Sequence, residues 1–417
     1  MSAAPRHAGP PDAVLGVTPR LAIEPATVPE AAEALRALAA DGLAVTFVGG
    51  GTDLELGAPP ARLDAVLHTR RLSRIREHAP ADQIVAVEAG ITIAELQRAL
   101  AAHGQRLALD PPFPERATAG GVVAANAFGP RRTRFGPVRD LVIGMTLVRA
   151  DGVVARGGGK VVKNVAGFDL PRLLCGSLGT LGLVAEVVFR LHPLPEASAT
   201  VTVAGLSAAQ VRAAAVAALD DRLEPVALAA LGEGAGFRLA FRFEGFGPGV
   251  AEQAERLAGS LAREGRAVER LAGPDEAAIW ARHEALRGGG DVRARASFAP
   301  AALAAAVEAL RPLEGALRGG ALVLHPVLGI ALVAGRLEDA AAAALAIEDA
   351  RTALARGAGA PRPGVVGTLV LTAAPPALRA LADPWGPPPP ALELMRRLKR
   401  ELDPDGRLAP GRFAGGI

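Results

Sequence analysis

The chain lacks or nearly lacks the residues on which several common kinds of site depend. Cys175 is its only cysteine in 417 residues, and tyrosine is absent. One cysteine excludes a disulfide framework, a cysteine-ligated iron–sulfur cluster and a cysteine-rich zinc site within this chain. Aromatic residues make up 3%, so few side chains could stack on nucleic acid bases, and the net charge is only +3, so little positive charge is available for a nucleic acid backbone. We therefore expect no nucleic acid partner.

Metal-binding and membrane-spanning patterns are also missing. The seven histidines form no H-x-H or H-E-x-x-H motif, so the sequence predicts no metal site. The longest apolar stretch, residues 319–335, contains His325 and Pro326 and is too short to cross a bilayer. It is better explained by two strands that meet at Leu328. Residues 1–14 lack the apolar core of a signal peptide, and we expect a soluble, cytoplasmic protein.

What the chain has is enough apolar sequence for two domains and an uneven distribution of glycine. Half of its residues are hydrophobic. Before residue 195, the patterns predict strands, short helices and glycine loops, including a helix over 24–40 and a Thr92–Glu95 capping box. After it, strand-like runs alternate with alanine-rich helices, which is typical of an α+β domain. The expected domains are residues 15–195, 196–390, and a segment, 391–417, that returns to the first domain.

Four glycine-rich stretches, residues 49–53, 118–129, 157–167 and 176–182, are the main candidates for a binding site. None completes G-x-G-x-x-G, a P-loop or G-x-S-x-G. Backbone N–H groups in such turns bind anions, and a helix opening at Thr118 would add donors at its N-terminus. A side chain at Gly50 is expected to block a pyrophosphate and to leave the chain folded. The alternative is that a glycine-rich chain simply has many turns.

The order and wording of these stretches resemble a known family. The sequence contains FVGGGTD at residues 47–53, TAGGVVAANAFGP at 118–130, KNVAGFD at 163–169 and GSLGTLG at 176–182. In this order they resemble the FAD-binding domain of the vanillyl-alcohol oxidase family, with the closest likeness to the E subunits of bacterial glycolate oxidases. LDP at 402–404 and APGR at 409–412 are similar to its closing motif. The implied fold is α+β: an FAD-binding domain of two subdomains and an α+β cap domain.

The resemblance implies a set of cofactor-binding residues. Those expected to contact FAD are Gly49, Gly50, Gly51, Thr52, Asp53, Pro111, Thr118, Gly120, Gly121, Asn126, Gly129 and Val184. Many family members bind FAD covalently through a histidine in the first loop, and this sequence has none there. Non-covalent FAD is therefore expected. Ala185 and Ala409 depart from the family, which often has Thr and Asn at these positions.

The resemblance also implies a function, with two alternatives. The first reading is an FAD-binding subunit that oxidises glycolate to glyoxylate and passes electrons to partners, namely a related flavoprotein and an iron–sulfur subunit, through which it contacts the membrane only indirectly. The alternatives are a stand-alone dehydrogenase of another small 2-hydroxy acid and a non-catalytic structural subunit. His325 has no second histidine within four residues, so the sequence identifies no catalytic base that would accept the hydroxyl proton of the substrate. Lys163 and Arg134 are candidate catalytic residues, with Arg131 and Arg132 as further candidates for binding the substrate carboxylate.

Overall fold

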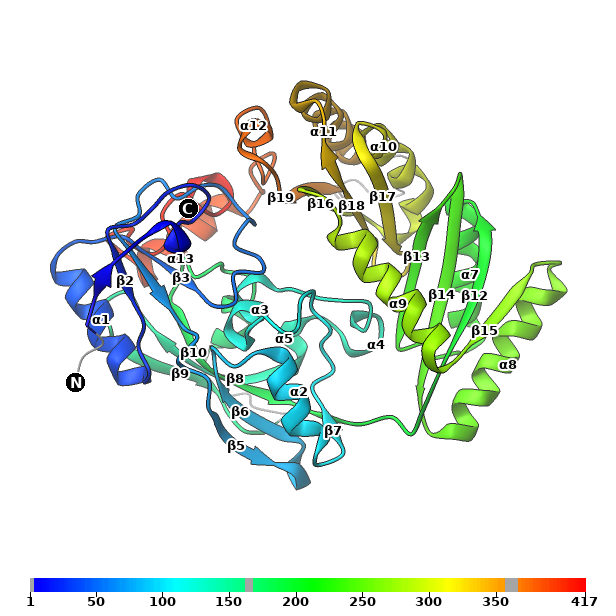
Figure 1. Cartoon of the computed structure of the whole chain (residues 1–417), viewed down its shortest axis with the longest axis horizontal. Helices are drawn as coiled ribbons and strands as arrows, with labels where there is room; N and C mark the ends of the chain where they lie inside the picture. The colour runs from blue at the N-terminus through cyan, green and yellow to red at the C-terminus, as the bar shows by residue number, and fades with distance from the viewer. Residues whose placement is uncertain (1–3, 162–167, 357–366) are drawn as a thin grey trace. The chain divides into compact units, whose positions relative to one another are not determined.

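The computed structural model describes residues 4–161, 168–356 and 367–417 (Figure 1). The chain divides into two compact units. Unit 1 contains the residues up to Gly129, residues 135–194 and residues 387–417, and unit 2 contains residues 130–134 and 195–386. The carboxy-terminal segment thus packs with the first half of the chain. No helix in the described ranges is long and apolar enough to cross a membrane.

The first sheet of unit 1 packs against one amphipathic helix. The strand order is β1-β2-β4-β3, and β2, β4 and β3 run parallel. The elements are β1 (Arg6–His7), β2 (Leu21–Ile23), α1 (Val28–Ala40), β3 (Val45–Val48) and β4 (Ala65–His68). Thr27 accepts a hydrogen bond from the backbone N–H of Glu30 and caps the helix, so α1 begins at Val28 and not at residue 24 as expected. Its buried face, including Leu35 and Leu38, packs on β3 and β4.

The second sheet of unit 1 is antiparallel, with strand order β5-β6-β10-β8-β9. Its strands are β5 (Ile75–Ala79), β6 (Ile84–Glu88), β8 (Val142–Val148), β9 (Val154–Gly158) and β10 (Leu183–Arg190). The predicted capping box forms at the start of α2 (Ile93–Ala101), where Thr92 and Glu95 bond reciprocally. The remaining elements of the unit include β7 (Gln105–Arg106), α3 (Ala119–Ala125), α5 (Val138–Leu141), α6 (Leu170–Leu174), β11 (His192–Pro193) and α13 (Leu392–Leu402).

Unit 2 is built on one eight-stranded antiparallel sheet, with strand order β15-β12-β14-β13-β17-β18-β16-β19. The strands are β12 (Ala197–Leu206), β13 (Ala227–Glu233), β14 (Gly236–Gly245), β15 (Val268–Leu271), β16 (Val292–Ser297), β17 (Leu317–His325), β18 (Ile330–Leu337) and β19 (Thr368–Ala373). β17 and β18 are paired as a hairpin, which confirms the two strands expected within residues 319–335. The sheet therefore joins strands from both ends of the unit.

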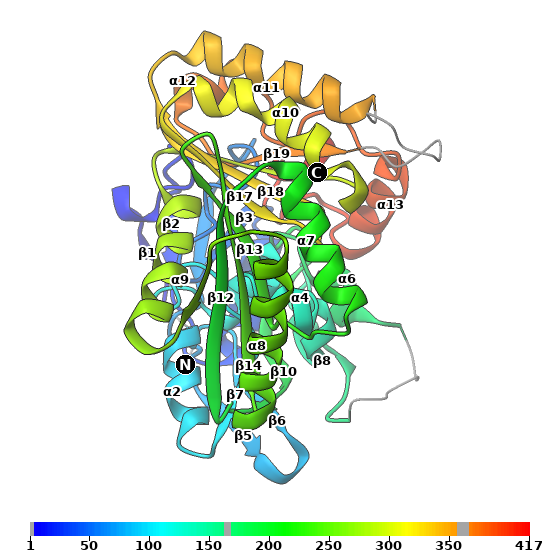
Figure 2. The same ribbon diagram turned by 90° about the vertical axis from the view of Figure 1, so that its right-hand side faces the viewer.

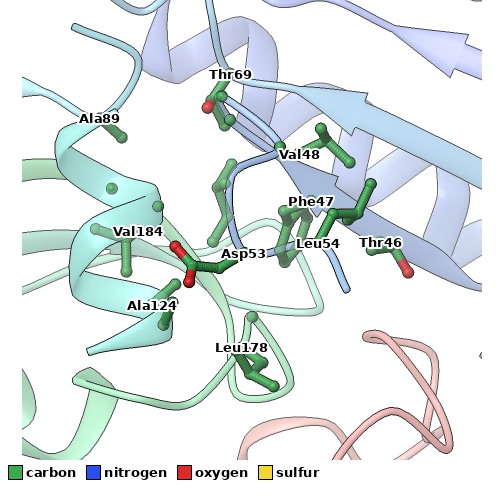
Figure 3. A pocket seen from close by; sticks show the side chains of 18 of the residues that line it. Thr46, Phe47, Val48, Asp53, Leu54, Thr69, Ala89, Ala124, Leu178 and Val184 are labelled. Carbon is green, nitrogen blue, oxygen red and sulfur yellow. The ribbon is translucent and has the colours of Figure 1, made fainter. Parts of the chain in front are cut away.

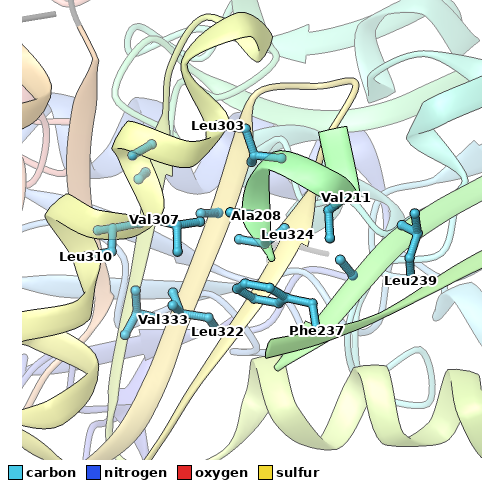
Figure 4. Packing of buried hydrophobic residues seen from close by; sticks show 14 of the residues in the cluster. Ala208, Val211, Phe237, Leu239, Leu303, Val307, Leu310, Leu322, Leu324 and Val333 are labelled. Carbon is cyan, nitrogen blue, oxygen red and sulfur yellow. The ribbon is translucent and has the colours of Figure 1, made fainter. Parts of the chain in front are cut away.

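Helices cover the two faces of this sheet unequally. The α-helices of the unit's described residues are α4 (Arg132–Phe135, whose last residue belongs to unit 1), α7 (Ala208–Asp220), α8 (Gly247–Arg263), α9 (Gly273–Gly288), α10 (Leu303–Gly315), α11 (Ala340–Ala355) and α12 (Pro376–Arg379). α7, α8, α10 and α11 share the main core with alternate strand residues such as Leu239 and Leu322 (Figures 2 and 4). The next residues along the strands, Ala240 and Val323, pack with α9. Because successive strand residues point to opposite faces, α9 lies on the face of the sheet opposite to α7, α8, α10 and α11. The α+β class expected from the sequence is confirmed.

Candidate cofactor site

A pocket in unit 1 lies where β3 ends and the first glycine stretch begins (Figure 3). Its lining residues surround about 740 Å³ of space, a volume that includes solvent at the open mouth. Its wall comes from residues 46–54, from Thr69, Ala89 and Arg412, and from residues within 120–125 of α3 and within 178–184. Three of the four glycine-rich stretches predicted as binding loops thus meet around one space.

Close packing between backbones brings two of these stretches together. A side chain on Gly49 would begin 2.2 Å from Thr118 Oγ1, so only glycine lets the first loop lie against the start of α3. Gly50 lies against another backbone segment, because its Cβ would be 1.7 Å from the carbonyl oxygen of Arg116. This corrects the expectation for Gly50: a side chain there would disrupt packing within the protein before it reached a ligand.

Gly51 faces open space in the same loop. Its φ is +72°, in the left-handed region that favours glycine, and no atom lies within 4 Å of the position a Cβ would take. The loop carbonyls are engaged by Arg70, whose Nε donates to Gly49 O at 3.2 Å and whose Nη2 lies 3.5 Å from Gly50 O. Within the described ranges, the backbone N–H groups of Gly50, Gly51 and Thr52 donate to no protein acceptor. The loop thus keeps three successive donors for a ligand.

The start of α3 contributes differently from what its sequence suggests. Thr118 caps the helix and accepts the N–H of Gly121 at 3.4 Å. The N–H groups of Ala119 and Gly120 donate to the carbonyls of Ile91 and Ala89 at 2.9 and 2.8 Å. These amides are therefore used within the protein, contrary to the expectation of donors at a helix N-terminus. Small residues of α3 instead provide room in the wall of the pocket.

The structure brings eight of the predicted FAD-binding residues into the pocket wall: Gly49, Gly50, Gly51, Thr52, Asp53, Gly120, Gly121 and Val184. Thr118, Pro111, Asn126 and Gly129 are not in the wall. Asn126 ends α3 with a φ of +50°, and its Oδ1 is buried without a hydrogen-bond partner in the part of the chain described. Their contact with FAD stays a prediction.

The proposed anchors for a substrate carboxylate bind acidic side chains of unit 2. Arg131 Nη2 lies 2.8 Å from Glu244 Oε1, and Arg134 Nη2 lies 3.1 Å from Glu224 Oε2. Lys163 lies outside the described residues. A substrate carboxylate would therefore have to compete with existing ion pairs for Arg131 or Arg134.

His325 does have a histidine neighbour, although none is close in sequence. The ring of His283, on α9, lies with its centroid 5.4 Å from that of His325 in an edge-to-face arrangement. Both side chains are fully buried, and burial lowers the pKa of each. His283 Nδ1 lies 3.0 Å from Glu284 Oε1, so the ring is held by a carboxylate. Sequence spacing could not reveal this pair, because sheet and helix packing creates it.

Several residues in the pocket wall were not predicted. They include Thr46, Thr69, Leu178, Gly179 and Arg412. Gly179 belongs to a glycine-rich stretch and Arg412 to the closing motif, so the sequence analysis singled out both segments but not these two residues. Thr46 Oγ1 is buried and has no hydrogen-bond partner in the described ranges. Cys175 lies elsewhere, and desolvation raises the pKa of its thiol to about 12, so it is a packing residue.

Comparison with known proteins identifies the ligand class. Residues 19–158 match the family model of an FAD binding domain. The chain contains an FAD binding domain. FAD is therefore its cofactor, and the available amides of the glycine loop and the open space at Gly51 fit a ligand that carries phosphate groups.

Two curated relatives carry related names. The chain is 34% identical over 198 residues to the glycolate oxidase subunit GlcD of Bacillus subtilis, covering 48% of this chain and 40% of that protein. It is 41% identical over 125 residues to the glycolate oxidase subunit GlcE of Escherichia coli, covering 30% and 36%. The chain thus spans less than half the length of these relatives.

A solved structure shows the same fold over nearly the whole chain. Alkyldihydroxyacetonephosphate synthase is similar with a TM-score of 0.71 and 16% sequence identity, covering 96% of this chain and 78% of that one. At this identity the likeness concerns the fold alone. The expected vanillyl-alcohol oxidase-type fold with an α+β second domain is thereby confirmed.

Proposed function

We propose that this chain is an FAD-dependent oxidoreductase that works as a flavoprotein subunit of a complex oxidising small 2-hydroxy acids, with glycolate as the substrate. The first glycine loop is the observation that carries the proposal, because its three available amides line a pocket in the FAD binding domain. The names of the GlcD and GlcE relatives support glycolate and a multi-subunit assembly.

Residues 50–52 would hold the phosphates of FAD through successive backbone N–H groups, which form an anion-binding concavity. Arg70 keeps the loop carbonyls turned away from these donors. Small residues of α3 and residues 178–184 leave room for the remainder of the cofactor. When bound, FAD supplies a two-electron acceptor for oxidation of a hydroxyl-bearing carbon. The protein's part is to bind and orient it.

The electrons need an exit, because Cys175 alone cannot ligate a cluster. We propose that they pass to an iron–sulfur subunit, with a related flavoprotein as second partner. The complex is cytoplasmic and meets the inner membrane only through its partners.

Flavin content of the purified chain is the first test. We expect a yellow protein whose FAD is released intact by acid, since the first loop has no histidine for a covalent bond. Flavin left on the denatured chain would contradict non-covalent binding. A colourless chain that does not take up added FAD would support the structural-subunit alternative.

Anaerobic stopped-flow mixing with glycolate is the second test. We expect slow reduction of the flavin in the isolated chain and fast reduction in the assembled complex. Fast bleaching of the lone chain by glycolate would contradict the division of labour. Fast bleaching by a different 2-hydroxy acid, with glycolate inert, would identify a stand-alone dehydrogenase of that acid.

A further inference from the structure

The carboxy-terminal segment, residues 399–412, is held to the rest of unit 1 by buried lysine and arginine side chains that donate hydrogen bonds to backbone carbonyls. Lys399 Nζ donates to Thr180 O and Leu408 O, each at 2.7 Å, and lies 2.7 Å from Asp403 Oδ2. Asp403 in turn accepts the N–H groups of Arg407 and Leu408. Thr180 belongs to the last glycine stretch, so this end of the segment is fixed beside residues 178–184 of the pocket wall.

The same segment also forms strand-like backbone hydrogen bonds with Val45. Val45 N donates to Arg407 O and Ala409 N donates to Val45 O, both at 2.8 Å. Val45 begins β3, the strand that leads into the first glycine loop. Arg407, which is 3% exposed, donates from Nη2 to Ala150 O at 2.8 Å, away from the pocket wall.

Arg412 reaches the first glycine loop itself. It is 3% exposed, lies in the pocket wall, and donates from Nη2 to Leu54 O at 2.9 Å and Leu56 O at 2.8 Å. The backbone of Arg412 is also an acceptor, since Ala58 N donates to Arg412 O at 3.0 Å. One buried guanidinium thus fixes the exit of the loop whose amides line the pocket.

We propose that Arg412 is a cofactor-positioning residue, which holds residues 50–54 in the form that presents their amides to the diphosphate of FAD. The inference rests on the proposed binding of FAD by this loop. Without the two charged hydrogen bonds, the loop exit would sample other conformations, and binding would require it to be ordered again. Glutamine is too short to bridge both carbonyls, whereas lysine keeps the charge and a donor but lacks the planar fork of arginine.

Equilibrium titration of FAD into the apo full-length chain tests this role. We expect Arg412→Gln to raise the Kd of FAD about tenfold to hundredfold, the range for lost hydrogen bonds to a charged group. Arg412→Lys should recover about half of that change on a logarithmic scale and should not reach the parental Kd. Arg407→Gln is the matched control: it removes a buried arginine–carbonyl bond from the same segment, and the Kd should stay within about twofold.

Thermal unfolding of the apo variants separates positioning from stability. Both glutamine variants should lower the Tm, and only Arg412→Gln should also raise the Kd. An unchanged Kd in Arg412→Gln, or equal changes in the two glutamine variants, would overturn the inference. If Arg412→Gln does not fold, Arg412→Lys decides, since parental affinity in that variant would also overturn it. Failure of the parent chain to bind FAD would instead overturn the proposed function.

Discussion

In unit 1 the polar surface around the pocket is mostly backbone, whereas on the α9 face of unit 2 it is mostly paired side chains. The first glycine loop leaves the amides of residues 50–52 without protein acceptors. On the α9 face, buried Glu276 accepts hydrogen bonds from Ser198 and Thr200, and Arg242 lies within 3.1 Å of both Glu276 and Glu244. Unit 2 satisfies these groups internally, and unit 1 keeps donors for a ligand. The contrast supports the proposed cofactor site in unit 1.

The largest expected effect on unfolding free energy comes from replacing one glycine in each unit. Gly50→Ala would place a Cβ 1.7 Å from Arg116 O, and we expect a loss of about 4 kcal/mol or more in unfolding free energy, among the severe effects of overpacking. In α8 of unit 2, a Cβ on Gly259 would meet its nearest atom at 3.7 Å. Gly259→Ala should therefore stabilise the chain by about 0.5–1 kcal/mol. Urea unfolding measures both, and a Gly50→Ala chain of parental stability would contradict the packing argument.

The next effect tests whether the polar network of unit 2 is structural. Glu276→Ala removes the acceptor shared by the Ser198 and Thr200 hydroxyls and one of the two carboxylates beside Arg242, and we expect a loss of about 3 kcal/mol, as for a broken buried ion pair. FAD content should not change, because Glu276 lies in unit 2 and the pocket in unit 1. Urea unfolding and flavin absorbance are the two readouts. Parental stability with reduced flavin would reverse the roles assigned to the units.

A smaller effect concerns the acid stability of unit 1. Buried Asp12 accepts hydrogen bonds from Arg6 and from the N–H of Gly9, and His68 Nε2 lies 2.8 Å away. The Arg6 guanidinium, above all, holds the pKa of this carboxyl well below its ordinary value near 4. The resulting stabilisation is complete above that ordinary pKa and is lost as the pH falls below it. Urea midpoints between pH 6 and pH 2 should fall more steeply for the parent than for Asp12→Asn, and parallel curves would contradict this.

Local signals predicted much of the fold. The Thr92–Glu95 box and the hairpin within residues 319–335 follow from capping chemistry and turn residues. α9 is harder to recognise, because its buried positions include Glu276, His283 and Arg287, so its apolar residues do not follow a helical period. The burial of these polar residues depends on strands far away in sequence.

The site was predictable where the backbone determines it. Glycine loops 49–53 and 118–121 carry their own conformational signal, and the structure places both at one pocket. Arg412 has no such signal, because its role comes from reaching Leu54 and Leu56, more than three hundred residues earlier in the chain. The use of the Ala119 and Gly120 amides by Ile91 and Ala89 likewise depends on tertiary packing.

FAD titration of Gly51→Asn against Gly42→Asn tests the central claim most directly. Both glycines have positive φ, +72° and +65°, and neither has an atom within 4 Å of a Cβ position. Asparagine tolerates this conformation better than other side chains, so both variants should fold. Gly51 lies in the pocket wall, whereas Gly42 follows the end of α1 and is not part of the pocket wall. We predict that Gly51→Asn weakens FAD binding by about tenfold or more, or about 1.4 kcal/mol, and that Gly42→Asn does not. Equal affinity in the two variants would contradict an FAD site at this loop.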